Sequence, residues 1–445
     1  MIILTRLSEP DLQPDYSRLV IRPFVPTVER IQAIIDRIAA MPEAEIRQEL
    51  EQVISVFSAD HGDFVERIKE HYNMAKKRLD EDAEPRTTEQ FPNFPVELPA
   101  RIPLESGPAE ARLLAGAYFT SEYAFEATAL FNPSIVLAPV QTSTAELHTE
   151  DLHTAELRFI LSARSVGEGH VSSISFRTGM IGTAGKVYID PVRKTAVRGK
   201  RVSKNGIAEI LFREETPISE RLLFPVSDDE RNGIEDARFV RFVNDDGTIC
   251  YYATYTAYDG KSISPKMIET TDFLRFKMRN ITGAMALNKG MALFPRKIKG
   301  RYAMLSRVDG ESLYIMFSKD LYIWDEAEKI AAPLFPWEFM QIGNCGSPIE
   351  LDEGWLVLTH GVGSLRCYSI GALLLDKDDP AKVIGRLSEP LISPGERERT
   401  GYVPNVVYTC GSIVNEGRLV IPYGSADRSI AFITVELEEL MKGLR

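Results

Sequence analysis

Residues 232–260 read NGIEDARFVRFVNDDGTICYYATYTAYDG. Two runs in this segment are rich in valine, isoleucine, tyrosine and threonine, and glycine, aspartate and asparagine separate them, as is typical of β-strands joined by turns. Comparable short runs continue beyond residue 110, among them RFILSARS, SLYIMFS, GWLVLTHGV, YSIGALLLD and SIAFITVEL. Long helical patterns are nearly absent there, so we expect an all-β fold for this part of the chain.

A weak internal repeat suggests how these strands are organised. An apolar strand that ends in a small polar cluster recurs near residues 174, 268, 314, 372 and 432. Five endings over about 335 residues give a mean period of roughly 67, which suits four-stranded propeller blades with insertions. The pattern predicts a five-bladed β-propeller, and a pair of β-sandwiches is the alternative.

The N-terminal part of the chain has a different character. Segments 28–41, 42–57 and 63–79 carry apolar residues at helical spacing, so residues 1–80 are expected to form a small helical module. Residues 81–109 contain six prolines and are expected to be an extended connector. The propeller would then occupy residues 110–445, and the helical module would serve as an oligomerisation or lid element, which makes a homo-oligomer possible.

Composition limits the classes of function. The chain has 445 residues with 52 basic and 64 acidic side chains, a formal charge of −12, which disfavours a nucleic-acid or anionic-membrane partner. Four cysteines without a C-x-x-C pair and the lack of a long apolar run suggest a cytoplasmic protein. His148 and His153 lie in a polar insertion without a third ligand, so no metal or other cofactor is expected.

Residues 235–238 form the most distinctive polar cluster. Glu235, Asp236 and Arg238 are expected in a loop just before a strand, with several tyrosines close in sequence. A surface ion pair would explain an isolated E-D-x-R sequence. Carbohydrate sites, however, combine carboxylates with aromatic rings, so the context favours a sugar-binding site.

These residues resemble the hallmark of glycoside hydrolase family 130, the β-mannoside phosphorylases and hydrolases. The similarity includes EDAR (235–238), YTAY (255–258), FNP (131–133), NKGMALFPRKIKGRYAMLSR (288–307), SKDLYIW (318–324), GWLVLTHGV (354–362), GYVPNVVYTCG (401–411) and PYGSAD (422–427). It spans roughly residues 110–445 in order. The resemblance implies a five-bladed β-propeller, in agreement with the repeat.

The resemblance also implies chemistry at the centre of the propeller. The enzyme would cleave the β-mannosidic bonds of manno-oligosaccharides with inversion, and Asp236 would be the general acid, in some members acting through a sugar hydroxyl. Such an acid must hold a proton near neutral pH, so Glu235 or burial should raise its pKa, while Arg238 would oppose this unless it turns away. Ala237 replaces the family's usual proline and removes no reactive group.

Further site positions follow from the same resemblance. For Asn132, Arg164, Asp259, Asn344, His360 and Asp427, the alternative is a buried hydrogen bond that holds a turn, and His360 could equally be a core histidine with its hydrogen bonds satisfied. The sugar-binding positions would be Asn132, Arg164, Glu235, Arg238, Tyr255, Asp259, Asn344, His360 and Asp427.

The choice between hydrolysis and phosphorolysis depends on a basic clamp or a second carboxylate. Phosphate is already a charged nucleophile and needs cations, whereas water needs a catalytic base. Lys289 and Arg307 match two cations of the family's phosphorylases, but Ser306 stands where a histidine is usual. Glu269 and Glu311 are candidate bases. We therefore expect hydrolysis, with a phosphorylase that uses inorganic phosphate as co-substrate as the alternative, and a non-catalytic glycan-binding propeller as the second alternative.

Overall fold

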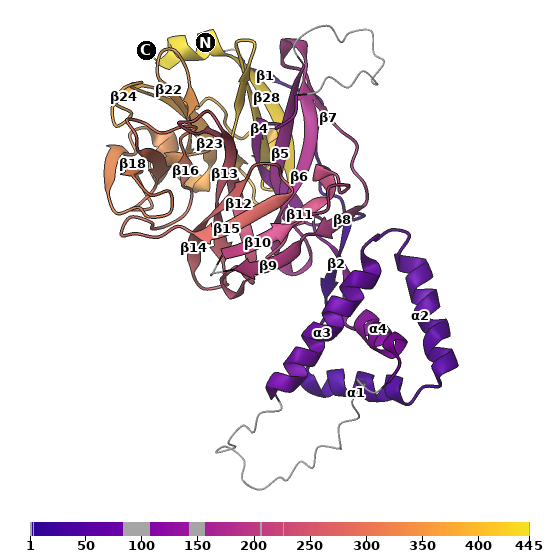
Figure 1. Ribbon diagram of the computed structural model, residues 1–445. Helices are drawn as coiled ribbons and strands as arrows, with labels where there is room; N and C mark the ends of the chain where they lie inside the picture. The colour runs from indigo at the N-terminus through magenta and orange to yellow at the C-terminus, as the bar shows by residue number, and fades with distance from the viewer. Residues whose placement is uncertain are drawn as a thin grey trace. The chain divides into compact units, whose positions relative to one another are not determined.

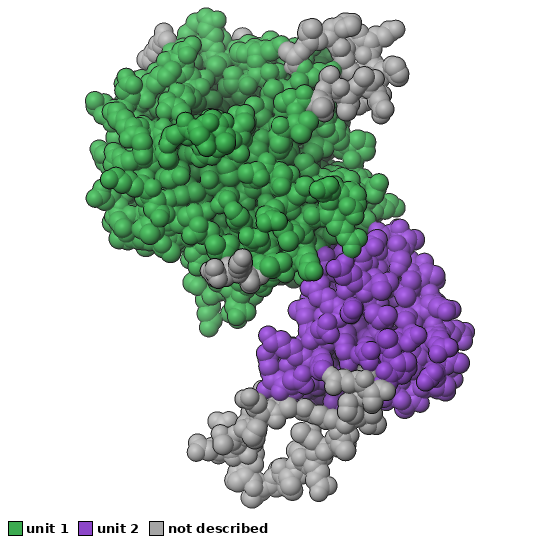
Figure 2. Space-filling model, in the orientation of Figure 1, with its two compact units in different colours: residues 1–18, 124–445 green, residues 19–123 purple. Residues whose placement is uncertain are grey.

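The computed structural model describes residues 2, 4–82, 107–141, 156–204, 207–225 and 227–444. It divides the chain into two compact units, unit 1 with residues 1–18 and 124–445 and unit 2 with residues 19–123 (Figure 2). Most of the expected connector over 81–109 lies outside the described residues, and so do His148 and His153. Among the described residues, no helix is long and apolar enough to cross a membrane.

Unit 2 contains the predicted helices and one more. The three predicted helices are confirmed as α1 (Val28–Ala39), α2 (Glu43–Phe57) and α3 (Phe64–Asp82), and β2 (Leu19–Pro23) and most of β3 (Thr120–Ala124) also lie in this unit. A fourth helix, α4 (Ala109–Tyr118), packs against the other three (Figure 1). A Cβ at Gly116 would lie 2.0 Å from the Ile68 carbonyl oxygen, so glycine permits the close approach of α3 and α4. The helical unit therefore extends past the connector, to residue 123, and excludes residues 1–18.

The strands of unit 1 belong to four hydrogen-bonded sheets (Figure 1). The largest sheet contains two antiparallel groups joined by one parallel pair, Ser172 with Gly233, so we describe five groups of strands. Group 1 contains β4 (Ala129–Leu137), β5 (Leu157–Val166), β6 (Ser172–Ile181) and β7 (Val187–Ile189). Group 2 contains β12 (Gly233–Val243), β13 (Ile249–Tyr258), β14 (Ile263–Thr270) and β15 (Arg275–Asn280). Group 3 contains β16 (Ala292–Leu293), β17 (Tyr302–Ser306), β18 (Leu313–Ser318) and β19 (Ala327–Ala331).

The last two groups have the same plan with one extra strand each. Group 4 contains β20 (Gln341–Asn344), β22 (Trp355–Val362), β23 (Tyr368–Leu375) and β24 (Val383–Arg386), with β21 (Ile349–Glu350) beside β22. Group 5 contains β25 (Val407–Tyr408), β27 (Arg418–Ser425), β28 (Ser429–Glu436) and β1 (Leu4–Arg6), with β26 (Ile413–Asn415) beside β27. The N-terminal strand β1 thus completes the sheet of the C-terminal strand β28.

The remaining elements of unit 1 are appended to these groups. Strand β10 (Ile207–Leu211) extends group 2 beside β15, and β9 (Lys200–Lys204) pairs with β10. Strand β11 (Arg221–Leu223) lies between β6 and β8 (Thr195–Arg198). Helix α5 (Leu437–Leu444) follows β28.

The predicted repeat is confirmed by this topology. Its five strand endings belong to β6, β14, β18, β23 and β28, and each of these is the third strand of its own group. The repeat is weak in sequence because only the strand pattern recurs, while the loops differ in length and composition.

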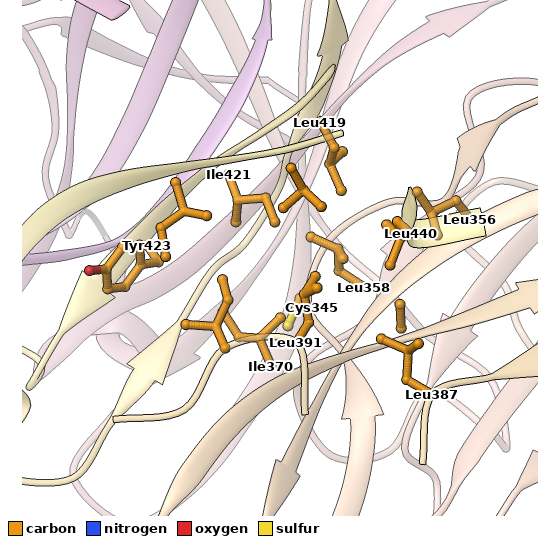
Figure 3. Packing of buried hydrophobic residues seen from close by; sticks show 14 of the residues in the cluster. Cys345, Leu356, Leu358, Ile370, Leu387, Leu391, Leu419, Ile421, Tyr423 and Leu440 are labelled. Carbon is orange, nitrogen blue, oxygen red and sulfur yellow. The ribbon is translucent and has the colours of Figure 1, made fainter. Parts of the chain in front are cut away.

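Both faces of the inner strands of the groups are largely buried, which explains why a strand such as β22 is predominantly apolar. In β22, Trp355 and Val357 pack with residues of group 3, whereas Leu356 and Leu358 pack with residues of group 5 (Figure 3). Successive side chains of a strand point to opposite faces, so a strand between two neighbours needs apolar residues at every position.

Five apolar clusters join the groups to one another. They lie between groups 1 and 2, 2 and 3, 3 and 4, 4 and 5, and 5 and 1. In the last of these, Leu130 and Phe159 of group 1 pack with Val420 and Phe432 of group 5. Every group therefore has two neighbours.

Candidate active site

The acidic cluster lies inside a strand rather than in the loop expected from the sequence. Glu235, Asp236 and Arg238 belong to β12, and the register between β12 and β13 shifts between Glu235 and Arg238. This bulge leaves Asp236 with a φ of 55°, in the left-handed region that residues other than glycine seldom adopt. A bulge bends its strand and redirects a side chain, and such strain concentrates at functional sites.

Three other non-glycine residues with positive φ line the same cavity as Asp236. They are Asn132 at a bulge in β4, Arg366 after β22 and Asp427 after β27, with φ values of 47°, 54° and 49°. The four residues come from groups 1, 2, 4 and 5. The fold therefore holds the backbone in an unfavourable conformation at four of the polar residues that line this cavity.

The cavity has a volume of about 170 Å³ and is lined by side chains from all five groups. Its lining residues are Asn132, Arg164, Asp236, Arg238, Lys289, Arg307, Gln341, His360, Arg366, Tyr368, Val403, Val406, Tyr408 and Asp427. Each of the five groups supplies at least one cation or carboxylate from a strand or from its adjoining turn. Group 3 supplies Arg307, directly after β17.

Asp236 is buried and surrounded by positive charge. Its Oδ1 accepts a hydrogen bond of 2.7 Å from Nδ2 of Asn132 and lies 3.7 Å from Nη1 of Arg164. Burial acts to raise the pKa of Asp236, but the charges of Arg164, Arg238 and Lys289 outweigh it and lower this pKa below its usual value. The expectation that Glu235 or burial would raise this pKa is therefore wrong for this arrangement of side chains.

Arg238 holds the bulge in place, and its charge also opposes a rise in the pKa of Asp236. Its Nη1 donates to the Asp236 carbonyl oxygen at 2.9 Å, its Nε to the Cys345 carbonyl at 2.8 Å and its Nη2 to the Tyr408 hydroxyl at 2.8 Å. All of these partners are neutral, so the buried guanidinium keeps its full charge toward the cavity.

Asp427 is the second carboxyl group of the cavity. Among the described residues, no hydrogen bond or ion pair holds its side chain. Burial, and then the negative charge of Asp236, raise the pKa of Asp427 to about 7. The pKa values of the two carboxyls therefore shift in opposite directions, so Asp427 keeps its proton to a higher pH than Asp236.

We expect the Asp427→Asn variant to become more stable than the wild type as the pH rises. The usual pKa of the carboxyl is 3.8 and its folded value is about 7, so the folded protein binds this proton more tightly than the unfolded chain. Raising the pH through this interval lowers the free energy of unfolding of the wild type and leaves the variant unaffected. The variant should gain ~2 kcal/mol between about pH 5 and pH 8, allowing for partial exposure of the group.

Urea unfolding followed by tryptophan fluorescence measures this difference. All three tryptophans, Trp324, Trp337 and Trp355, lie in unit 1 and report on it alone. A stability difference between variant and wild type that is the same at both pH values would contradict the prediction.

Arg307 and Arg366 line the cavity without an ion pair to a described residue, and a third cation, Lys289, is paired only with Glu235. Arg307 is 8% exposed, its Nε is buried without a partner, and among the described residues no carboxylate or carbonyl pairs with its guanidinium. Arg366 lies over the Tyr368 ring at 5.9 Å. Lys289 lies 3.6 Å from Glu235 and is partly exposed. Buried arginines are normally paired, so the unpaired Arg307 indicates a site for an anionic ligand.

Two predicted residues support the cavity without lining it. Glu235 pairs with Nη2 of Arg164 at 2.7 Å and with Lys289 at 3.6 Å, and so positions two of the cations. Asn344 donates from Nδ2 to the Gly290 carbonyl at 2.9 Å, which fixes the loop that carries Lys289.

Tyr255 and Asp259 lie outside the cavity lining. The Tyr255 hydroxyl donates to Glu230 at 2.8 Å and is buried, and Glu230 also pairs with Lys266 at 3.1 Å. Asp259 accepts the backbone N–H groups of Lys261 and Ser262 and closes a turn. Asp259 thus makes the turn-holding hydrogen bonds that were the alternative to sugar binding, and the Tyr255 hydroxyl is likewise engaged in a buried hydrogen bond.

Neither candidate base lines the cavity. Glu269 pairs with Lys277 at 2.9 Å and accepts the Tyr322 hydroxyl at 2.9 Å. Glu269 lies opposite Tyr252 of β13, whereas Glu235 lies opposite Thr256 of the same strand. These two positions of β13 are four residues apart, which corresponds to about 13 Å along the strand. Glu311 is exposed in the turn between β17 and β18. Their assignment as bases stays a prediction from sequence.

We expect the Tyr255→Phe variant to lose stability rather than substrate affinity. The change removes one buried hydrogen bond to Glu230, so the free energy of unfolding should fall by about 1–2 kcal/mol. The KM for a mannoside should stay within about twofold of wild type, since the ring does not line the cavity. Urea unfolding and initial rates measure the two quantities, and a large rise in KM at unchanged stability would restore the sugar-binding role.

Four polar residues of the cavity were not predicted as site residues. They are Gln341, Arg366, Tyr368 and Tyr408. Tyr408 lies within the GYVPNVVYTCG segment that resembles the family, so the sequence could have indicated it as a site residue. Arg366 and Tyr368 follow the GWLVLTHGV strand. Nothing in the sequence indicates that the turn between this strand and the next one lines the cavity.

Comparison with known proteins gives a consistent result. The family model of glycoside hydrolase family 130, described as beta-1,4-mannooligosaccharide phosphorylase, matches residues 194–445. A 1,2-beta-oligomannan phosphorylase of Thermoanaerobacter sp. (strain X514) is 33% identical over 54% of this chain and 79% of that protein. A beta-1,2-mannobiose phosphorylase of Listeria innocua is 30% identical over 70% of this chain and 83% of that protein.

Solved structures share the fold. The beta-1,2-mannobiose phosphorylase of Listeria innocua, in complex with beta-1,2-mannobiose, matches with a TM-score of 0.52 at 21% identity, over 71% of this chain and 92% of that chain. A structure from work on family 130 hydrolases that target beta-1,2 mannosidic linkages in Candida mannan matches with a TM-score of 0.50 at 19% identity, over 71% and 86%. These similarities concern the mainly β fold alone.

Proposed function

The chain belongs to glycoside hydrolase family 130, and we propose that it cleaves β-mannosidic bonds by phosphorolysis and releases mannose 1-phosphate. The resemblance noted in the sequence is thereby confirmed at the level of the family. The observation that carries the proposal is the buried, unpaired guanidinium of Arg307 beside further cations in a cavity that also contains Asp236. A phosphate dianion would supply the missing counter-charge.

We further propose that the five groups close into a five-bladed β-propeller around this cavity. Two observations support closure. Five apolar clusters join each group to two neighbours, including group 5 to group 1, and each group contributes residues to one central cavity. A ring of packed sheets leaves a channel at its axis, where strand ends converge.

The proposed reaction needs one acid and no base. A phosphate oxygen held by Arg307, Arg366 and Lys289 would attack the anomeric carbon, while the bond from that carbon to the leaving oxygen breaks. Asp236 would supply the proton for the leaving oxygen, directly or through a sugar hydroxyl. Attack from the face opposite the leaving group inverts the β configuration, so the product would be α-mannose 1-phosphate.

Phosphate would also correct the protonation of Asp236. Lys289, one of the three cations that hold the pKa of Asp236 low with Arg164 and Arg238, is also one of the proposed phosphate ligands. A bound dianion offsets their charge and adds its own negative potential, so the pKa of Asp236 should rise when the co-substrate is present. The acid would then be protonated in the complex in which it is needed.

Hydrolysis has less support than the sequence suggested. The case for it rested on a depleted cationic clamp and on Glu269 and Glu311 as bases. Arg366 adds a cation to the clamp, and neither glutamate lines the cavity. The curated relatives above are phosphorylases, which favours the alternative reading. A hydrolase built on this cavity would have to use Asp427, the one carboxylate besides Asp236 among the described lining residues.

A product assay with and without phosphate tests the proposal. We expect β-1,2- or β-1,4-mannobiose to yield mannose 1-phosphate and mannose in equal amounts when phosphate is present, and negligible mannose when it is absent. β-1,3-Mannobiose and cellobiose serve as comparison substrates. Release of mannose at the same rate without phosphate would establish hydrolysis instead.

A further inference from the structure

His360 lies in β22 directly opposite Gly343 of β20, and its ring is fixed by its neighbours. The ring is 2% exposed and stacks with the Tyr368 ring at a centroid distance of 6.1 Å. The Tyr408 ring meets it edge-on at 5.0 Å. Two aromatic rings and the strand pairing therefore leave the imidazole little freedom to turn.

Hydrogen bonding assigns the tautomer of this imidazole. Its Nδ1 lies 3.2 Å from the carbonyl oxygen of Asn344, which can only accept, so Nδ1 carries the hydrogen. Burial, and then the charges of Arg307 and Arg238, hold the pKa of His360 well below its usual value, so the ring is neutral. Nε2 is then an acceptor, and within the described part of the chain its one donor is the Gln341 amide, at a long 3.4 Å.

This acceptor lies on the cationic side of the cavity. A Cβ built on Gly343 would come within 2.4 Å of Arg307 Cδ and 2.6 Å of His360 Cε1, so both side chains pack against the same glycine. His360 and Arg307 both line the cavity, so a ligand bound there by Arg307 can also contact the imidazole of His360. An anion there meets donors on the arginine and one acceptor on the histidine.

We propose that Nε2 of His360 accepts the hydrogen of the P–OH group of bound hydrogenphosphate and thereby selects phosphate over sulfate. The inference rests on the proposed phosphorolysis. Hydrogenphosphate has one hydroxyl to donate and three other oxygens for the cations. Sulfate has the same shape but no proton near neutral pH, so one of its oxygens would face the Nε2 lone pair without a hydrogen between them. A site that contains an acceptor rejects the unprotonated anion because two acceptors repel.

Inhibition by sulfate tests the selectivity. In the wild type, sulfate should compete with phosphate with a Ki at least about tenfold above the phosphate KM, whereas arsenate, which carries a hydroxyl, should compete near that KM. In the His360→Gln variant, whose amide can donate, the ratio of sulfate Ki to phosphate KM should fall about tenfold or more. The matched control is His170→Gln, an exposed histidine bonded to Tyr402, which should leave the ratio unchanged.

Nitrogen NMR of histidine-labelled wild type provides a readout that needs no active variant. The protein has six histidines, and the His360→Gln spectrum identifies the signal of His360. We expect a neutral ring with the hydrogen on Nδ1, and an Nε2 shift that moves on addition of phosphate or arsenate but not of sulfate.

Several outcomes would overturn the proposal. They are a hydrogen on Nε2, an imidazolium ring, an Nε2 shift that moves with mannose and not with phosphate, or a sulfate ratio unchanged in His360→Gln. If the enzyme releases mannose without phosphate, the proposed function itself fails, and the product assay shows this before either experiment is read.

Discussion

The Asp236→Asn variant is expected to release mannose 1-phosphate from β-1,2-mannobiose at least about 10³ times more slowly than the wild type. General acid catalysis contributes about 10²–10⁴ in rate, and asparagine has no proton to give. The substitution is close to isosteric. The new amide oxygen can still accept hydrogen bonds from Asn132 and Arg164, which contact Asp236 in the wild type. The loss should therefore appear in kcat, with the KM for both substrates within a few fold of wild type.

Two further measurements make this result specific. A mannosyl donor with a good leaving group, such as a nitrophenyl β-mannoside, needs little protonation, so the variant should recover much of its rate on it. The control Asp246→Asn changes an exposed turn aspartate whose carboxylate caps Thr248, and it should keep wild-type kinetics. Unchanged turnover of mannobiose by Asp236→Asn would refute the assignment of the acid.

The Arg307→Gln variant is expected to raise the KM for phosphate about 100-fold and to leave the KM for the mannoside within about threefold. A charge-assisted hydrogen bond to an anion contributes about 1.5–3 kcal/mol, and a bidentate arginine makes two. Glutamine keeps much of the aliphatic stem that packs against Gly343, so the change removes the charge with little change in packing. Initial rates over a range of phosphate concentrations measure the effect.

A conservative exchange and a distant control complete this experiment. Arg307→Lys restores the charge without the planar pair of donors, and should recover part of the phosphate affinity. Arg301→Gln removes an exposed arginine that lies over the Phe317 ring in the same group, and should leave the phosphate KM unchanged. A phosphate KM that is unaltered in Arg307→Gln would separate this residue from the co-substrate.

Much of the fold could be predicted from local patterns. The five repeated strand endings each mark the third strand of a group, because both faces of the inner strands are largely buried and the apolar run is therefore long enough to recognise. The helix α4 was missed because it is short and follows a proline-rich segment, and its burial depends on three helices distant in sequence. Helices of this length are stabilised by packing, which a local pattern does not contain.

The candidate site was only partly accessible from sequence. The motif located Asp236, but the direction of its pKa shift depends on Arg164 and Lys289, which arrive from other groups. Arg366 lines the cavity from a turn in which Leu365 and Arg366 have positive φ values. Neither residue type favours this conformation, so the turn could not be predicted from the sequence. Glu269 was a candidate base because it occupies a position where a small residue was expected, and the register of β14 places it opposite Tyr252, away from the cavity lining.

The pairing of β1 with β28 has a consequence for how the molecule is made. Leu4 lies opposite Val435, so β1 is synthesised long before the strand with which it pairs, and group 5 is complete only when β28 has been made. Unit 2 lies between β1 and β4 in the sequence and can fold in the interval, because its contacts lie within the one continuous stretch of residues 19–123. Loss of Leu4–Arg6 would leave β28 as an edge strand of group 5, and a chain that ended before β27 would contain Asp236 and still lack Asp427.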